Sequence, residues 1–250
     1  MRMHLRDATY AVVDVETTGF DRERDRVVEV ACVLVRRGVQ VRAFSSLVNP
    51  GRPIPARATD VHGITDADVA AAPPIGEVAP LLRRLCAGAI VVAHNATFDR
   101  GFLPMLAGWP GLCTLRLSRH LFPELRSHAL QALRHELALP MSSDPGDAHR
   151  ALSDVRVTAT ILEILLERYL GIGFPPDTDA LLAYAESRVR FPRFPFGRYR
   201  HVPLPEIPAG YLHWMLRATD PPFDPDVRAT VGAELKRRYA VAYQQVREAV

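Results

Sequence analysis

Two carboxylates lie close together in the sequence, just after an apolar run. Residues 10–17 read YAVVDVET, so Asp14 and Glu16 stand at the end of a segment that is typical of a buried β-strand. Side chains two positions apart on a strand project from the same face, and these acids should therefore lie side by side. Like charges held close together and away from water repel each other. The pair thus indicates a bound cation, unless the two acids are simply solvated at a strand end.

Two more acids fall on the apolar faces of segments with helical spacing. Asp99 shares a face with Phe102 and Leu106. Asp154 heads a stripe that continues through Ile161. Each acid could instead be a helix-start carboxylate that the helix dipole favours. Acids from three separate elements nevertheless form a set of hard oxygen ligands, which suits a pair of Mg²⁺ or Mn²⁺ ions and does not suit structural zinc.

His149 is the candidate general base. It stands five residues before Asp154, at the end of the segment MSSDPGDAH, whose composition is typical of a mobile loop. An imidazole with an ordinary pKa of about 6.5 can take a proton from a water molecule near neutral pH. A lone loop histidine is more often exposed to solvent, so the residue by itself does not decide between these interpretations.

The segments that would position these residues follow in a regular order. Three strand-like segments come first, with Gly38 in a tight turn between the second and the third. Strand-like and helical segments then alternate, which predicts an α/β fold with a mixed sheet covered by helices. We expect strands at 10–17, 26–38, 39–48 and 89–95, a strand running into a helix at 111–117, and helices at 76–88, 96–107, 128–139 and 150–170.

A domain boundary is expected where this pattern stops. Gly and Pro cluster at 171–176, and the sequence beyond is punctuated by proline and mostly helical in pattern. We therefore expect a larger domain over residues 1–170 and a small, mostly helical C-terminal module over 171–250.

The composition limits what else the protein can be. A net charge of +3 permits a nucleic-acid partner without indicating one. Lys236 is the only lysine among 31 basic residues, and a GC-rich genome explains this arginine bias better than phosphate binding does. Three scattered cysteines argue against a disulfide framework and a zinc site. No apolar segment suits a membrane span or a signal peptide, so we expect a cytoplasmic protein without a membrane partner.

Three short motifs together resemble one enzyme family. Asp14-x-Glu16 followed by Thr-Thr-Gly, His94-Asn95-x-x-Phe98-Asp99, and His149-x-Ala151-x-x-Asp154 are similar in order and spacing to the motifs of the DEDDh 3′–5′ exonucleases. This ribonuclease H-like group includes the polymerase III epsilon subunit, RNase T and exonuclease X, and the similarity covers roughly residues 8–170. A sister subgroup has tyrosine at the place of Arg150. The resemblance implies a mixed five-stranded sheet, two Mg²⁺ or Mn²⁺ ions held by the four acids, and the catalytic residues Asp14, Glu16, Asp99, His149 and Asp154.

The resemblance also implies a reaction and a substrate. We expect a 3′–5′ exodeoxyribonuclease that releases nucleoside monophosphates from single-stranded DNA 3′ ends, in DNA repair, turnover or proofreading. An exoribonuclease of the RNase T kind is the alternative, and a catalytically inactive module that binds nucleic acid or a polymerase is the alternative of another class. No feature of the sequence requires an oligomer. By the same resemblance, which extends to the segment VHGIT at 61–65, the terminal nucleotide is cradled by Thr17, Phe20, His62 and Phe98.

The C-terminal module begins with alternating arginines and rings. The segment 188–201 contains five arginines, four aromatic residues and no acid, which suits single-stranded nucleic acid. The rings could equally pack on the nuclease domain and leave the arginines solvated. The stretch from Phe196 onward also resembles the small C-terminal module of exonuclease X-type proteins, except that His201 replaces a glycine, the residue that a tight turn there would favour. The candidate nucleic-acid contacts are Arg188, Arg190, Arg193, Arg198 and Arg200.

Overall fold

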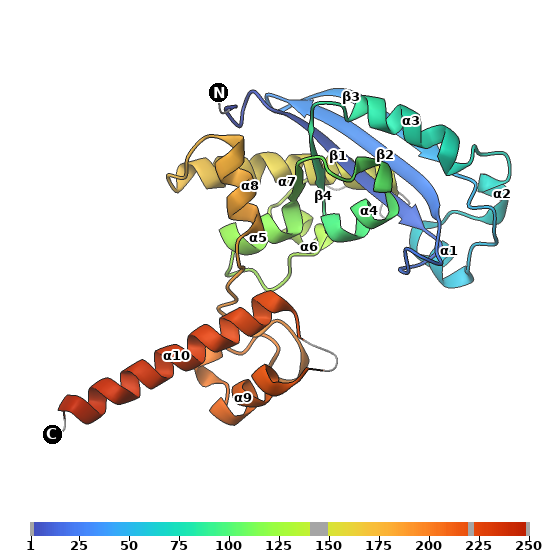
Figure 1. Ribbon diagram of the computed structural model, residues 1–250. Helices are drawn as coiled ribbons and strands as arrows, with labels where there is room; N and C mark the ends of the chain where they lie inside the picture. The colour runs from blue at the N-terminus through green and yellow to red at the C-terminus, as the bar shows by residue number, and fades with distance from the viewer. Residues whose placement is uncertain (1–2, 141–149, 220–222, 249–250) are drawn as a thin grey trace. The chain divides into compact units, whose positions relative to one another are not determined.

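The computed structural model describes residues 3–140, 150–219 and 223–248 (Figure 1). The chain divides by its contacts into two compact units. One comprises Met1–Leu117 with Ser127–Ala185, and the other comprises Ser118–Arg126 with Glu186–Val250. Within the described residues, no helix combines the length and the apolar character that crossing a membrane requires.

A five-stranded mixed sheet forms the centre of the first unit. Its order is β3-β2-β1-β4-β5, in which β1, β2 and β3 are antiparallel neighbours and β4 and β5 run parallel to β1. The predicted α/β fold with a mixed five-stranded sheet is thereby confirmed. Because β1, β4 and β5 are parallel, their carboxyl ends meet at one edge of the sheet. The strands are β1 (Thr9–Thr17), β2 (Val27–Arg36), β3 (Val39–Leu47), β4 (Ile90–Ala93) and β5 (Gly111–Cys113).

Helices cover both faces of this sheet. Alternate residues of β1, Ala11, Val13 and Val15, belong to a core shared with α3 and α4. The other residues of β1 face α7, which packs on β1 and β2. Asp14 and Glu16 fall on this second face, as their spacing predicts. The helices of the unit are α1 (Ala56–His62), α2 (Asp66–Val69), α3 (Ile75–Leu85), α4 (Ala96–Phe102), α6 (Leu130–Glu136), α7 (Ala151–Gly171) and α8 (Thr178–Glu186), with α5 (Thr114–Leu121) leading out of it.

The helix expected at 96–107 is shorter in the structure. Helix α4 ends at Phe102, and a separate 3₁₀ turn, η1 (Pro104–Leu106), follows. Proline disfavours the helical conformation of the residue before it, and Leu103 indeed has φ −117° and ψ 61°.

The contact boundary between the two units falls after Ala185, and the boundary expected from the sequence is at residue 170. A cluster of rings explains the difference. Tyr169 near the end of α7 stacks on Phe174 with ring centroids 4.9 Å apart, and Tyr184 of α8 lies 4.5 Å from Phe174. The rings join α8 to the first unit across the Gly- and Pro-rich segment.

The second unit has a small core of its own. It is mostly helical: the 3₁₀ turns η3 (Gly197–Tyr199) and η4 (Leu204–Glu206) come first in the chain, and the helices α9 (Ala209–Arg217) and α10 (Pro225–Glu248) follow. Phe194 is only 1% exposed and packs with Leu212, Met215 and Val231. The aromatic residues of the segment 188–201 therefore contribute to this core.

His201 adopts the backbone conformation that a glycine would favour. Its φ is 66°, and its N–H donates to the carbonyl of Phe194 at 2.7 Å, so the tight turn is formed. A side chain in the left-handed region costs about 1–2 kcal/mol relative to glycine.

We expect His201→Gly to stabilise the second unit by about 1 kcal/mol. Urea unfolding followed by Trp214 fluorescence, in a Trp109→Phe background, would measure this change. The matched control is Arg200→Gly, which should destabilise the unit because the φ of Arg200, −54°, suits any residue. Equal destabilisation by both changes would show that the turn at His201 is not strained.

Candidate active site

Three carboxylates meet at the edge of the sheet where β1 ends. Asp14 and Glu16 come from β1, and Asp154 comes from the first turn of α7. One carboxylate oxygen of each lies within 4.8 Å of those of the other two. Three oxygens at this separation can bind a single cation or a close pair of cations.

Asp99 is the fourth acid of this cluster. It lies in α4, which directly follows β4, and its side chain is only 2% exposed. Its charge contributes to the raised pKa of both Asp14 and Glu16, so it interacts electrostatically with these two acids. Among the described residues, its Oδ2 atom is buried without a hydrogen-bond partner. A buried carboxylate oxygen of this kind is a suitable ligand for a cation.

The electrostatics of the cluster favour a cation. Burial, together with the neighbouring carboxylates, raises the pKa of Asp14 well above its usual range. Burial, followed by Asp154, Glu29 and Asp99, raises the pKa of Glu16 to about 8, and Arg150 only partly offsets this rise. Burial raises the pKa of Asp99 to about 7. The raised pKa values of Asp14, Glu16 and Asp99 mean that a nearby positive charge would favour their ionised forms, and a donor set made only of carboxylate oxygens fits hard divalent ions such as Mg²⁺ or Mn²⁺.

The chain after β1 is closed into a compact loop by Asp25. The carboxylate of Asp25 accepts hydrogen bonds from the hydroxyl of Thr18 at 3.0 Å and from the N–H of Asp21 at 2.9 Å. A side chain at Gly19 would collide with this carboxylate and push it out of its hydrogen bonds, which explains the glycine there. The register of β1 against β2 also shifts between Glu16 and Thr17, and such a bulge redirects the chain as it leaves the sheet.

This loop presents Phe20 at the surface beside the acids. The side chain is 87% exposed, and its ring centroid lies 6.1 Å from that of Phe98, the neighbour of Asp99 in α4. Phe98 in turn packs against Phe102 at 5.0 Å, so its ring is anchored to the core. The two exposed or partly exposed rings suit stacking on a nucleotide base, which stays a prediction.

We expect Phe20→Ala to raise the KM for an oligonucleotide about tenfold and to leave kcat nearly unchanged, because stacking on a base contributes about 1–3 kcal/mol. The melting temperature should not change, since the ring buries little surface. Steady-state kinetics with Leu81→Ala, an exposed apolar residue on α3, as the control would test this. An unchanged KM would remove Phe20 from the substrate contacts.

Thr17 and His62 are the other two residues for which a nucleotide contact is predicted. The Thr17 hydroxyl donates to the carbonyl of Gly19 at 2.6 Å, so it already supports the turn after β1. His62 is buried at the end of α1, and its Nδ1 atom accepts the N–H of Ile64 at 3.0 Å. Contact of either residue with a nucleotide stays a prediction.

His94 and Asn95 shape the start of α4. His94 directly follows β4 in the chain. Its Nδ1 atom lies 3.0 Å from Thr114 Oγ1, and its Nε2 atom lies 2.9 Å from the carbonyl oxygen of His128. Asn95 has φ 74°, which turns the chain sharply from β4 into α4. Together they fix the direction in which α4 carries Asp99.

Glu29 is a fifth acid at the site, and sequence reasoning missed it. It lies opposite Glu16 in the register of β1 and β2, and it is 3% exposed. Arg150 donates two hydrogen bonds to its carboxylate, at 3.1 and 3.0 Å, and the N–H of Ala151 donates a third at 3.0 Å. Glu29 thus fixes the N-terminus of α7, four residues before Asp154. An acid inside the apolar run VVEVAC of an expected strand was the available signal.

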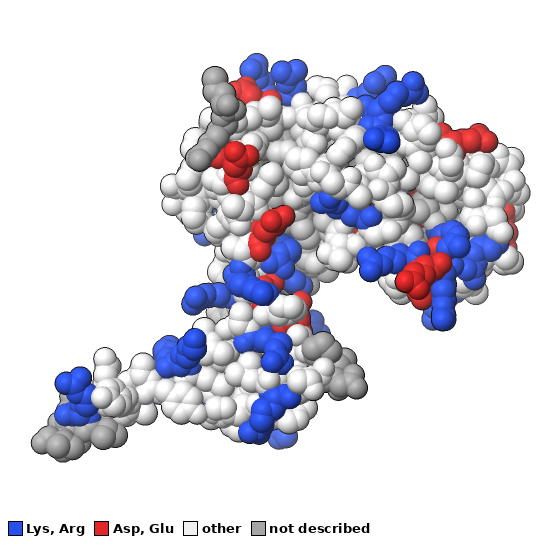
Figure 2. Space-filling view, in the orientation of Figure 1, with Lys and Arg blue, Asp and Glu red and all other residues white. Residues whose placement is uncertain are grey.

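His149, the predicted general base, lies outside the described residues. In the second unit, the candidate arginine contacts have other partners as well: Arg188 lies 3.6 Å from Asp226, Arg193 donates to the carbonyl of His201, and Arg198 lies over the ring of Tyr199. Basic side chains form separate patches on the face of this unit in Figure 2. Phe194 cannot stack on a base because it is buried, and the role of the arginines in binding stays a prediction.

Comparisons with known proteins agree with this geometry. The exonuclease family model RNase_T matches residues 11–162. The DNA polymerase III subunit epsilon of Aquifex aeolicus is 37% identical over 184 residues, which cover 69% of this chain and 89% of that protein. An epsilon-like protein of Rhodobacter capsulatus is 44% identical over 161 residues, 60% of this chain, but the chain spans only 23% of that relative's length.

The solved structures support the same assignment. Exonuclease X in complex with 5′ overhanging duplex DNA matches with a TM-score of 0.59 and 33% identity, over 70% of this chain and 99% of that one. Escherichia coli exonuclease I with a dT13 oligonucleotide matches in fold with a TM-score of 0.57 at 18% identity, over 66% of this chain and 42% of that one. The predicted ribonuclease H-like architecture and the resemblance to the DEDDh group are therefore confirmed. The chain belongs to the exonuclease family.

Proposed function

We propose that this chain is a 3′–5′ exodeoxyribonuclease that releases nucleoside monophosphates from the 3′ ends of DNA, with a preference for single strands. The observation that carries the proposal is the convergence of Asp14, Glu16, Asp99 and Asp154 from three separate elements at one sheet edge. The family depends on divalent metal ions, and the oxygen donor set at this edge fits them. Similarity to exonuclease X, which was solved with DNA, supports DNA as the substrate.

The four carboxylates would hold two Mg²⁺ or Mn²⁺ ions. Such ions, when bound, activate the attacking water and offset the negative charge that develops on the phosphate and on the leaving 3′ oxygen. Glu29 and Arg150 fix the start of α7 and thereby the position of Asp154. Asp25 fixes the loop that carries Phe20. The rings of Phe20 and Phe98 would hold the terminal base, which positions the last phosphodiester at the acids.

His149 would accept the proton of the attacking water. Its neighbour in the chain, Arg150, is bound to Glu29 on β2. A histidine with an ordinary pKa is neutral, and hence a competent base, above about pH 6.5.

A gel time course tests the proposed function. Purified protein with Mg²⁺ or Mn²⁺ would be incubated with 5′-labelled single-stranded DNA, duplex DNA and RNA of matched sequence. A ladder that shortens from the 3′ end, most rapidly on single-stranded DNA, is the expected result. Faster shortening of RNA would favour an exoribonuclease of the RNase T kind. Binding without shortening of any substrate would contradict catalysis and favour a binding module.

A further inference from the structure

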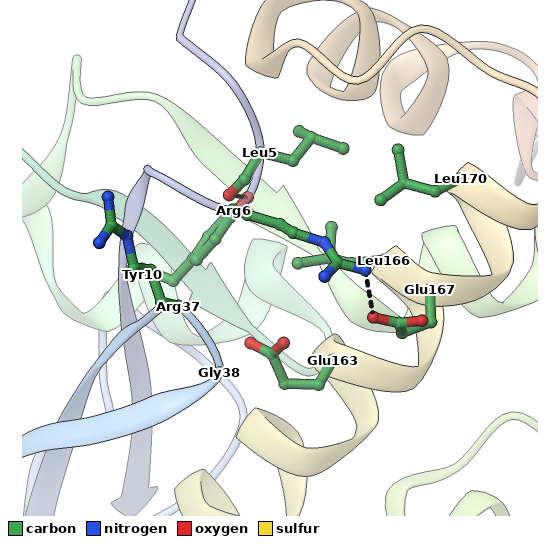
Figure 3. A pocket seen from close by; sticks show the side chains of 9 residues that line it. All are labelled: Leu5, Arg6, Tyr10, Arg37, Gly38, Glu163, Leu166, Glu167 and Leu170. Atoms are coloured by element: carbon green, nitrogen blue, oxygen red, sulfur yellow. Dashed lines mark hydrogen bonds and ion pairs between the residues drawn. The ribbon is translucent and has the colours of Figure 1, made fainter.

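A cavity of about 430 Å³ lies in the first unit at the end of β1 opposite to the acids. Figure 3 shows its walls, which come from the N-terminal segment, the start of β1, the β2–β3 turn and the second half of α7. Tyr10 and Asp14 are four residues apart on β1, so the cavity lies about 13 Å from the acid cluster. It is therefore a separate site, and the proposed nuclease reaction does not use it.

The apolar part of the cavity is formed by leucines. Leu5, Leu166 and Leu170 line it together with the ring of Tyr10. The Tyr10 hydroxyl donates to the carbonyl of Leu5 at 2.9 Å, so this polar atom already has a partner. The volume lies within the range of about 300–1,000 Å³ that is usual for small-molecule sites.

The charged groups around the cavity pair with one another, with one exception. Arg6 binds Glu167 at 2.8 Å, and Arg37 binds Asp7 at 2.9 Å. Glu163 has neither a hydrogen bond nor an ion pair within the described part of the chain, and in Figure 3 its carboxylate lies among the cavity residues, between Arg6 and Gly38. Glu163 is thus the one carboxylate lining the cavity that lacks a partner among the described residues.

The surroundings of Glu163 disfavour its charge. Burial, together with Glu167, raises the pKa of Glu163, and Arg6 only partly offsets the rise. Glu163 lies close to the turn, because a Cβ atom at Gly38 would be in ordinary contact with Glu163 Oε2, at 3.4 Å. The turn residues Arg37 and Gly38 both have positive φ, which is typical of a tight turn between antiparallel strands and fixes this rim of the cavity.

We propose that this cavity binds a small organic cation, with an ammonium or guanidinium group at Glu163 and an apolar body against Leu5, Leu166 and Leu170. A charge-assisted hydrogen bond to a half-buried carboxylate supplies the specificity, and the leucines supply the contact area. A single carboxylate among leucines does not offer the several oxygen ligands that a divalent metal ion needs.

Calorimetric titration with phenethylammonium would test the proposal. The neutral probe 2-phenylethanol has nearly the same shape and lacks the charge. We expect saturable binding of the cation, at least about tenfold tighter than that of the alcohol. Glu163→Gln should lower the affinity for the cation to that for the alcohol, while Glu136→Gln, which removes an exposed carboxylate of α6 in the same unit, should change neither.

A second variant separates loss of the site from loss of the fold. Leu170→Trp retains Glu163 and fills the apolar part of the cavity, so it should abolish binding of both probes, with thermal melts confirming that each variant is folded. The proposal is overturned if the cation and the alcohol bind equally to the wild-type protein, if Glu163→Gln binds the cation as tightly as the wild type does, or if no saturation occurs up to about 10 mM. None of these measurements depends on nuclease activity.

Discussion

Asp14→Asn should lower the rate of DNA shortening by a factor of at least about 10²–10³, because the substitution keeps the shape of the side chain and removes its charge. Asp14 interacts with all the other acids of the site, since Asp99, Glu16, Asp154 and Glu29 all raise its pKa. The loss should appear in kcat and should not be recovered by more substrate.

The stability of the same variant should change in the opposite sense. Burial and four like charges make ionised Asp14 unfavourable in the metal-free protein. A raised folded-state pKa means that the ionised carboxylate costs stability once the pH rises above its unfolded-state pKa of about 4. Asparagine removes that cost, so the melting temperature of metal-free Asp14→Asn at pH 7 should equal or exceed that of the wild type.

The combination of lost activity and retained stability excludes misfolding as the cause. Asp60→Asn, which changes an exposed acid of α1, is the matched control and should affect neither quantity. Wild-type rates in Asp14→Asn would contradict the assignment of this acid and, with it, the proposed four-carboxylate site.

The acid cluster could be predicted because local periodicity determines it. The alternation of β1 puts Asp14 and Glu16 on the face toward α7, and helical spacing puts Asp99 and Asp154 on inward faces. The order of strands then brings these faces to one edge of the sheet. Each step depends only on near neighbours in the sequence and on general topology.

The supporting contacts could not be predicted in the same way. Glu29 and Arg150 are far apart in the sequence, and nothing local to either residue identifies the other as its partner. The closure of the loop by Asp25 depends likewise on the folded path of residues 18–26. The rings of the segment 188–201 show the same limit, because a ring in a core and a ring that stacks on a base look alike in a sequence.

Glu29→Gln is expected to impair catalysis although Glu29 lies behind the site. Gln is nearly isosteric and can still accept the N–H of Ala151, but it loses the charged pair with Arg150. Because the pair fixes the start of α7, Asp154 should lose its position relative to Asp14 and Glu16. Partners that orient metal ligands typically contribute about 10–100-fold to metal affinity or activity.

The expected signature of Glu29→Gln is a positioning effect. The Mn²⁺ concentration for half-maximal activity should rise about 10–100-fold, with the KM for DNA nearly unchanged, since no DNA contact is removed. Stability should fall by about 1–3 kcal/mol, because hydrogen bonds to a buried charged group are lost. Asp7→Asn removes another arginine–carboxylate contact, one that is exposed at the surface, and should change both quantities little.

A double variant decides whether the effect passes through Arg150. If Glu29 acts by holding this arginine, then adding Arg150→Gln to Glu29→Gln should cause little further loss, and the two single changes should be far from additive. Additive losses would show that Glu29 and Arg150 act independently. Normal metal dependence in Glu29→Gln would show that the N-terminus of α7 is held by other contacts, and that the buried acid of β2 serves the fold and not the site.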